Sequence, residues 1–148
     1  MEIPLIGVIG TSMKEDERRV PIHPEHLDRI PPNILQKLIF EKGYGLPFNI
    51  SDEELSQRTG GVSSRSSLLS DIGIVIIIKP VVSDLKTLKK GGVLWGYTHC
   101  VQQEEMTQVA IDRKLTLIAF EDMFVWKPNG EMGRHTFYKN NEMAGYSA

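Results

Sequence analysis

Three basic side chains of different types could do chemistry in this sequence, and two of them follow apolar segments. Lys79 comes directly after the β-branched run at residues 74–78, and His99 follows the apolar segment 93–97, while Arg19 lies in a charged segment near the amino terminus. Arginine can hold a carboxylate through two parallel hydrogen bonds, lysine can polarise a carbonyl oxygen, and histidine can transfer a proton near neutral pH. Together they would suit a small 2-oxo acid, whose carboxylate and ketone oxygen both attract positive partners.

The apolar run before Lys79 is the element that must position it. A continuous run of five β-branched residues is too short to span a membrane and is typical of a central parallel strand that is covered on both faces. In open α/β sheets, ligands bind in the crevice outside the carboxyl ends of the strands. We therefore expect a ligand site beside Lys79, where an ammonium group suits a carboxylate.

Apolar runs alternate with amphipathic stretches along the rest of the chain. Strands are expected at residues 3–9, 36–41, 72–78, 93–97 and 115–120, and helices at 25–29, 51–58, 64–70, 84–89 and 102–113, with another beginning near residue 140. Ser51 and Glu54 have the spacing of a capping box at a helix start. The alternation predicts an α/β fold, a Rossmann-like (flavodoxin-like) three-layer domain with a mostly parallel sheet.

Composition and length exclude several classes of protein. The chain has 148 residues, about one average domain, and a formal net charge of -2, which argues against a nucleic-acid partner. It lacks an apolar stretch of roughly 20 residues and a signal peptide, so we expect a cytoplasmic protein without a membrane partner. Cys100 is the single cysteine, and the histidines show no zinc-ligand spacing beyond the weak His23/His26 pair, so no metal site is expected. The sequence is also compatible with a homo-oligomer.

Each candidate side chain also has a purely structural interpretation. Arg19 could form a surface salt bridge with Glu15 or Asp16, and such loop pairs contribute little. His99 could be a hydrogen-bonded core histidine. Tyr97 could pack against a face of the sheet, because alternate residues of a strand point to opposite sides.

Several segments carry a resemblance to a known family. They are RRVPIHP at 18–24, FEKGYG at 40–45, IKP at 78–80, GYTH at 96–99 and NEMAG at 141–145. In order and spacing they resemble the N-terminal domain shared by alanine dehydrogenases, transhydrogenase α-subunits, saccharopine dehydrogenases and N5-(carboxyethyl)ornithine synthases. The passages at 95–99 and 137–142 look most like the carboxyethylornithine synthase branch.

This resemblance implies roles for four residues. Arg19 and Lys79 would bind the carboxylate and carbonyl of the oxo acid, and Tyr97 would contribute to substrate binding. His99 would lie against the reacting centre, so that His99 and Lys79 are the expected catalytic residues. The sequence departs from the family in that Pro80 follows Lys79 without an intervening glutamate, a change that bears on the identity of the amino partner.

The resemblance also implies a function for a longer protein. It indicates an NAD(P)-dependent amino-acid or opine dehydrogenase that condenses a 2-oxo acid such as pyruvate with the amino group of ornithine or a similar amino acid. Alternatives are alanine dehydrogenase, which uses pyruvate and ammonia, and a noncatalytic module that binds a metabolite or a partner.

Residues 1–148 would then form a single substrate-binding domain. The sequence contains no Gly-x-Gly-x-x-Gly followed by a helix and an acidic residue, so no cofactor-binding residue is expected here. NAD or NADP would be bound mainly by a nucleotide-binding domain that is absent from this chain. We therefore expect the isolated chain to be inactive, because the hydride donor would be missing.

Overall fold

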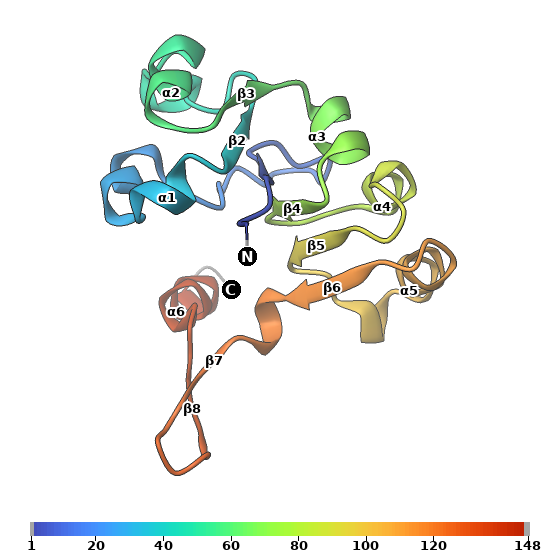
Figure 1. The fold of residues 1–148 in the computed structure, drawn as a ribbon. Helices are drawn as coiled ribbons and strands as arrows, with labels where there is room; N and C mark the ends of the chain where they lie inside the picture. Colours follow the sequence, from blue (N-terminus) through green and yellow to red (C-terminus); the bar gives the residue numbers. More distant parts are fainter. Residues whose placement is uncertain (1, 147–148) are drawn as a thin grey trace.

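The computed structural model describes residues 2–146 and contains a six-stranded sheet (Figure 1). Its strands are β1 (Ile6–Ile9), β2 (Leu38–Glu41), β3 (Gly61–Ser63), β4 (Ile74–Ile77), β5 (Val93–Gly96) and β6 (Thr116–Ala119). They lie in the order β3-β2-β1-β4-β5-β6, and every neighbouring pair is parallel. The predicted α/β fold with a mostly parallel sheet is therefore confirmed.

Helices cover the two faces of this sheet, because alternate residues of each strand point to opposite sides. Helices α3 (Arg65–Asp71), α4 (Val82–Thr87) and α5 (Glu104–Asp112) pack on one face, against a core that includes Ile9. On the other face, a 3-10 helix (Pro24–Arg29), α1 (Pro32–Leu35) and α2 (Asp52–Arg58) surround a core that includes Val8. The neighbouring residues Val8 and Ile9 thus belong to different cores.

Local signals account for most of the helix boundaries. Ser51 accepts a hydrogen bond from the Glu54 amide, and Glu54 accepts one from the Ser51 amide, so the predicted capping box begins α2. The helix expected at 25–29 does end at Arg29, and Pro32 begins the separate helix α1, which the sequence interpretation did not identify. Proline is favoured at the first position of a helix, where its missing N–H has no partner to lose. Further 3-10 helices occupy Leu46–Phe48, Cys100–Gln102 and Phe120–Asp122.

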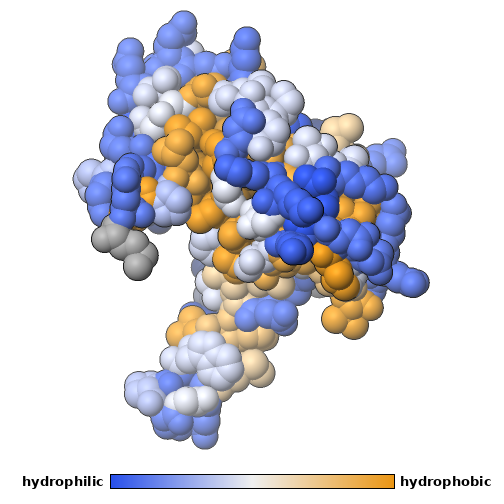
Figure 2. Space-filling view, turned by 45° about the vertical axis from the view of Figure 1, so that its right-hand side comes forward, coloured by the Kyte–Doolittle hydropathy of each residue, from blue (hydrophilic) through white to orange (hydrophobic). Residues whose placement is uncertain are grey.

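Three strands escaped the prediction. Strand β3 has only three residues, too few to show an apolar repeat. The other two, β7 (Phe124–Trp126) and β8 (Met132–His135), form an antiparallel hairpin. This hairpin projects from the body of the molecule and is followed by α6 (Tyr138–Tyr146) (Figures 1 and 2).

The surface is hydrophilic over much of the face in Figure 2, with apolar surface running through its middle. Within residues 2–146, no helix combines the length and apolar character that crossing a membrane would require.

Gly96 ends β5 just before the expected site residues and lies very close to β4. A Cβ atom at this position would be 2.0 Å from the carbonyl oxygen of Ile77. We expect Gly96→Ala to lower the free energy of unfolding by about 1–3 kcal/mol, because the two strands would have to separate. Urea unfolding followed by circular dichroism measures this loss.

Gly73→Ala is the matched control for that substitution. It makes the same chemical change in the loop before β4, where a Cβ atom would have no neighbour within 4 Å. A loss of stability as large in Gly73→Ala as in Gly96→Ala would contradict the close-approach explanation.

Candidate functional site

The order of the strands creates a topological switch point beside β1. From β1 the chain builds β2 and β3 on one side of the sheet, and it then places β4, β5 and β6 on the other side. The loops that follow β1 and β4 therefore diverge, and a crevice between such loops is where open α/β sheets bind ligands. The Ser12 hydroxyl joins the two loops here, because it donates a 2.9 Å hydrogen bond to the carbonyl oxygen of Lys79.

A cleft of about 520 Å³ lies at this edge of the sheet. Lys79, Tyr97 and His99 all line it, and the exposed Lys14 lines it as well. The rings of Tyr97 and His99 are nearly parallel, with their centroids 6.0 Å apart. Three of the four side chains that the sequence singled out therefore share one cleft.

Arg19, the fourth, lies beside this cleft without lining it. It borders a neighbouring hollow that also includes Tyr97, and its guanidinium carbon is 5.7 Å from the centre of the Tyr97 ring. Its Nη1 atom donates a 2.7 Å hydrogen bond to Oδ1 of Asn140 in α6. Tyr97 thus lines both the cleft and the neighbouring hollow. Burial raises the pKa of its phenol, so the hydroxyl is neutral at neutral pH and can act as a hydrogen-bond donor.

Glu17 connects the two expected cations, and the sequence interpretation missed it. Its carboxylate accepts hydrogen bonds from Nε (2.7 Å) and Nη2 (2.5 Å) of Arg19 and lies 3.4 Å from Nζ of Lys79. The hydrogen bond from Arg19 is the main reason that the pKa of Glu17 falls to about 2. The salt bridge that was considered between Arg19 and Glu15 or Asp16 is replaced by this pair, in which Glu17 is nearly buried and Arg19 is 40% exposed. Within a charged run, no pattern distinguishes the buried carboxylate from its exposed neighbours.

Glu121 holds His99 in an uncommon backbone conformation. His99 has φ 45° and ψ 38°, in the left-handed region that non-glycine residues seldom occupy. Its amide donates a 2.6 Å hydrogen bond to Oε1 of Glu121, and the same oxygen is 3.9 Å from Nδ1 of the imidazole. His99 is therefore half-exposed in the cleft wall rather than a core histidine. The sequence interpretation did not identify Glu121, which comes from the segment after β6.

A buried ionic network supports the loop that leads to Glu17. Arg65 in α3 forms ion pairs with Asp84 (2.8 Å) and Glu41 (3.6 Å), and it also donates a hydrogen bond to the carbonyl oxygen of Thr11. Glu41 accepts hydrogen bonds from the amides of Gly10 and Thr11, both at 2.9 Å. Because Glu41 and Asp84 are only 6% and 4% exposed, their charges depend on these partners.

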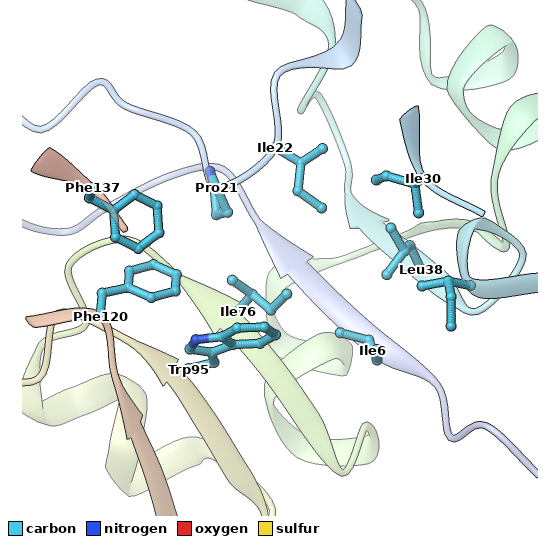
Figure 3. Close-up of a pocket in the computed structure, with 10 residues that line it drawn as sticks. Ile6, Pro21, Ile22, Ile30, Leu38, Ile76, Trp95, Phe120 and Phe137 are labelled. Carbon is cyan, nitrogen blue, oxygen red and sulfur yellow. The ribbon is translucent and has the colours of Figure 1, made fainter. Parts of the chain in front are cut away.

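A second cavity, of about 280 Å³, is lined by aliphatic and aromatic residues (Figure 3). In the close-up, Phe120 lies between Phe137 and Trp95, with ring centroids 5.0 Å and 6.0 Å away respectively. Ile6 and Ile76 line it from the strands. Because no titratable side chain lines this cavity, it offers no acid or base for chemistry. Trp95 contributes to the apolar packing there.

The glycines of two turns have structural explanations. Gly43 has φ +81° in the turn after β2, a conformation that favours glycine, and a Cβ atom on Gly60 would lie 2.6 Å from the carbonyl oxygen of Gln36. Among the residues that the structure describes, no group of three or more histidine, cysteine, aspartate or glutamate side chains could hold a metal ion.

The sequence matches a family model described as alanine dehydrogenase/PNT, N-terminal domain, over residues 8–131. The alanine dehydrogenase of Methanococcus maripaludis is 31% identical over 121 residues, which cover 79% of this chain and 31% of that protein. The alanine dehydrogenase of Staphylococcus haemolyticus is 29% identical over 114 residues, covering 76% of this chain and 30% of its own length. This chain thus spans about a third of the length of these curated relatives.

Two solved structures have a similar fold. A transhydrogenase from Sinorhizobium meliloti superposes with a TM-score of 0.65 at 18% identity, over 80% of this chain and 35% of that one. An L-alanine dehydrogenase superposes with a TM-score of 0.64 at 23% identity, over 85% of this chain and 34% of the other. At these identities the similarity establishes the fold.

Proposed function

Because this chain belongs to the alanine dehydrogenase/PNT N-terminal domain family, we propose that it is the substrate-binding domain of an NAD(P)-dependent amino-acid dehydrogenase. Its substrate is a 2-oxo acid such as pyruvate. The observation that supports this most directly is the cleft at the switch point, which is lined by Lys79, Tyr97 and His99. An ammonium, a phenol and an imidazole offer hydrogen bonds to both oxygen-bearing ends of such an acid.

The residues have distinct roles in this proposal. Lys79 faces the cleft and polarises the ketone oxygen, which makes the carbonyl carbon more electrophilic. Arg19 attracts the carboxylate from its position beside Tyr97 and contributes to the positive potential that both cations create. His99 hydrogen-bonds to the reacting oxygen or transfers its proton, and Glu121 fixes the backbone that presents it.

The cofactor would be bound by another part of a longer protein and would reach this cleft from there. The glycines of the turns at 43–45 and 60–61 have structural explanations, so they do not indicate a phosphate-binding loop. Bound nicotinamide would supply the hydride, and the residues of this chain would hold and polarise the oxo acid. A cytoplasmic location belongs to the same proposal.

The amino partner divides the proposal into two versions. The two curated relatives described above are alanine dehydrogenases, which favours ammonia as the amine. The resemblance of segments 95–99 and 137–142 to carboxyethylornithine synthases favours ornithine or a similar amino acid. Turnover of the full-length protein with pyruvate, NADH or NADPH, and a panel of amines distinguishes them. Absence of turnover with every amine would favour a noncatalytic binding module instead.

Lys79→Met tests the oxo-acid site itself. This substitution keeps most of the length of the side chain and removes its charge, so one charge-assisted hydrogen bond to the ligand is lost. We expect pyruvate to bind about 10- to 100-fold more weakly, which corresponds to the usual strength of such a bond. Isothermal titration calorimetry of this chain with millimolar pyruvate measures the change.

Lys127→Met is the matched control, because it removes the same charge from the exposed hairpin, where Lys127 pairs with Glu131. Pyruvate binding should not change in this variant. Equal binding of pyruvate by the wild type and Lys79→Met would rule out the role of Lys79.

A further inference from the structure

The two cations of the proposed site, Arg19 and Lys79, already have an anionic partner in Glu17. Glu17 accepts hydrogen bonds from the backbone amide (3.0 Å), Nε and Nη2 of Arg19, and the ammonium of Lys79 is 3.4 Å from its second oxygen. The side chain of Glu17 is 5% exposed, whereas those of Arg19 and Lys79 are 40% and 33% exposed. The Glu17 side chain is thus nearly buried against two more exposed cations, and it also borders a neighbouring hollow beside Tyr44.

This carboxylate is charged at every pH at which the protein would work. Its pKa is about 2, because the hydrogen bonds and charge of Arg19 outweigh the cost of burial. Water screens a nearly buried charge only weakly, so its field extends into the cleft that Lys79 lines. A ligand there meets the charge of Glu17 as well as those of the cations.

The charges of these three side chains leave a single positive charge for a ligand. Arg19 and Lys79 contribute two positive charges and Glu17 removes one. Lys14 also lines the cleft, and water and salt screen its charge in part, as they do that of the exposed Arg19. One carboxylate neutralises what remains, and a second carboxylate would be repelled by Glu17.

We infer that Glu17 is a specificity-determining residue that restricts this site to 2-oxo acids with one carboxylate. The inference rests on the proposed function, because it assumes that oxo acids bind beside Lys79. It adds a preference for ligands with one negative charge, which the two cations do not explain, because Arg19 and Lys79 without Glu17 would favour a dianion. Glu17 acts through the charge balance of the site and not by contact with the reacting atoms.

Replacement of Glu17 by neutral residues tests this inference. Calorimetry measures the affinities of pyruvate and of 2-oxoglutarate, which carries a second carboxylate, for the wild type, Glu17→Gln and Glu17→Ala. Both acids should gain affinity when the negative charge is removed, but 2-oxoglutarate should gain more because it has twice the charge. We expect the ratio of its affinity to that of pyruvate to rise roughly 10- to 100-fold in both variants.

Two further variants separate the local charge from other effects. Glu17→Asp retains the charge and should retain the wild-type preference for pyruvate. Glu15→Gln removes a charge from the exposed part of the same loop and should change the ratio by less than about 2-fold, because water screens that charge.

The outcomes distinguish this inference from the proposed function. If the wild type binds pyruvate and the affinity ratio stays constant in both neutral variants, or if both acids lose affinity equally, Glu17 is only a structural partner of Arg19 and the inference is wrong. If the wild type binds neither acid, the proposed function fails and the inference fails with it. A raised ratio that Glu17→Asp restores to the wild-type value supports the inference.

Discussion

Arg65→Met is expected to lower the free energy of unfolding by about 3–5 kcal/mol, the usual cost of removing one partner from a buried ion pair. Arg65 is shared by Glu41 and Asp84, which are almost completely buried. Without the guanidinium, both carboxylates would keep backbone hydrogen bonds but lose their opposite charge. Equilibrium unfolding in urea at pH 7 measures the loss.

Arg58→Met makes the same chemical change on the surface. Arg58 pairs with Asp28, whose side chain is 85% exposed, and such pairs contribute less than about 1 kcal/mol. In the Arg65→Met background, Asp84→Asn should recover part of the lost stability, because one unpaired charge is removed. The buried-network explanation fails if Arg65→Met costs no more than Arg58→Met.

Acid should destabilise the protein through Glu17. The pKa of its carboxyl is about 2 in the folded protein and 4.5 without these partners, so folding stabilises the ionised form. The resulting stability is fully present above about pH 4.5 and is lost as the pH falls through about 2. The difference between these pKa values corresponds to about 3 kcal/mol. This is a large fraction of the stability of a typical domain.

The free energy of unfolding of the wild type and of Glu17→Gln, measured between pH 7 and pH 2, tests this effect. The variant lacks the titrating group, so the difference between the two proteins should change by about 3 kcal/mol across that range. Glu54→Gln should show a smaller pH-dependent difference, because the Glu54 carboxylate is fully exposed in its capping box. A wild-type-minus-Glu17→Gln difference that is independent of pH would contradict the assignment.

The regular elements were predictable where local signals are strong. The β-branched run before Lys79 does form a strand with neighbours on both sides, and the capping box at Ser51 begins α2. Strand β3 was missed because its three residues show no apolar repeat and are held by pairing with β2. The hairpin was missed because β7 and β8 are short and are held by pairing with each other. Tertiary pairing outweighs local preference in such segments.

The candidate site was only half predictable. Lys79, Tyr97 and His99 could be placed at one edge because parallel strands end on the same side of a sheet. The carboxylates of Glu17 and Glu121 could not be placed there. Acidic residues in loops are usually solvated, and the sequence does not reveal which of them are buried. Glu17 belongs to the site through its contact with Lys79, and Glu121 through the hydrogen bond that it accepts from the His99 amide.

By itself, the sequence determined the class of fold, the strand ends and the basic groups they carry, because hydrophobic periodicity and residue chemistry are local properties. Only the tertiary structure decided that β1 lies between β2 and β4, which creates the crevice, and that Glu17 is nearly buried against Arg19 and Lys79. Strand order and burial depend on how distant segments pack together. The net charge that a ligand meets follows from that packing, and residue types alone do not reveal it.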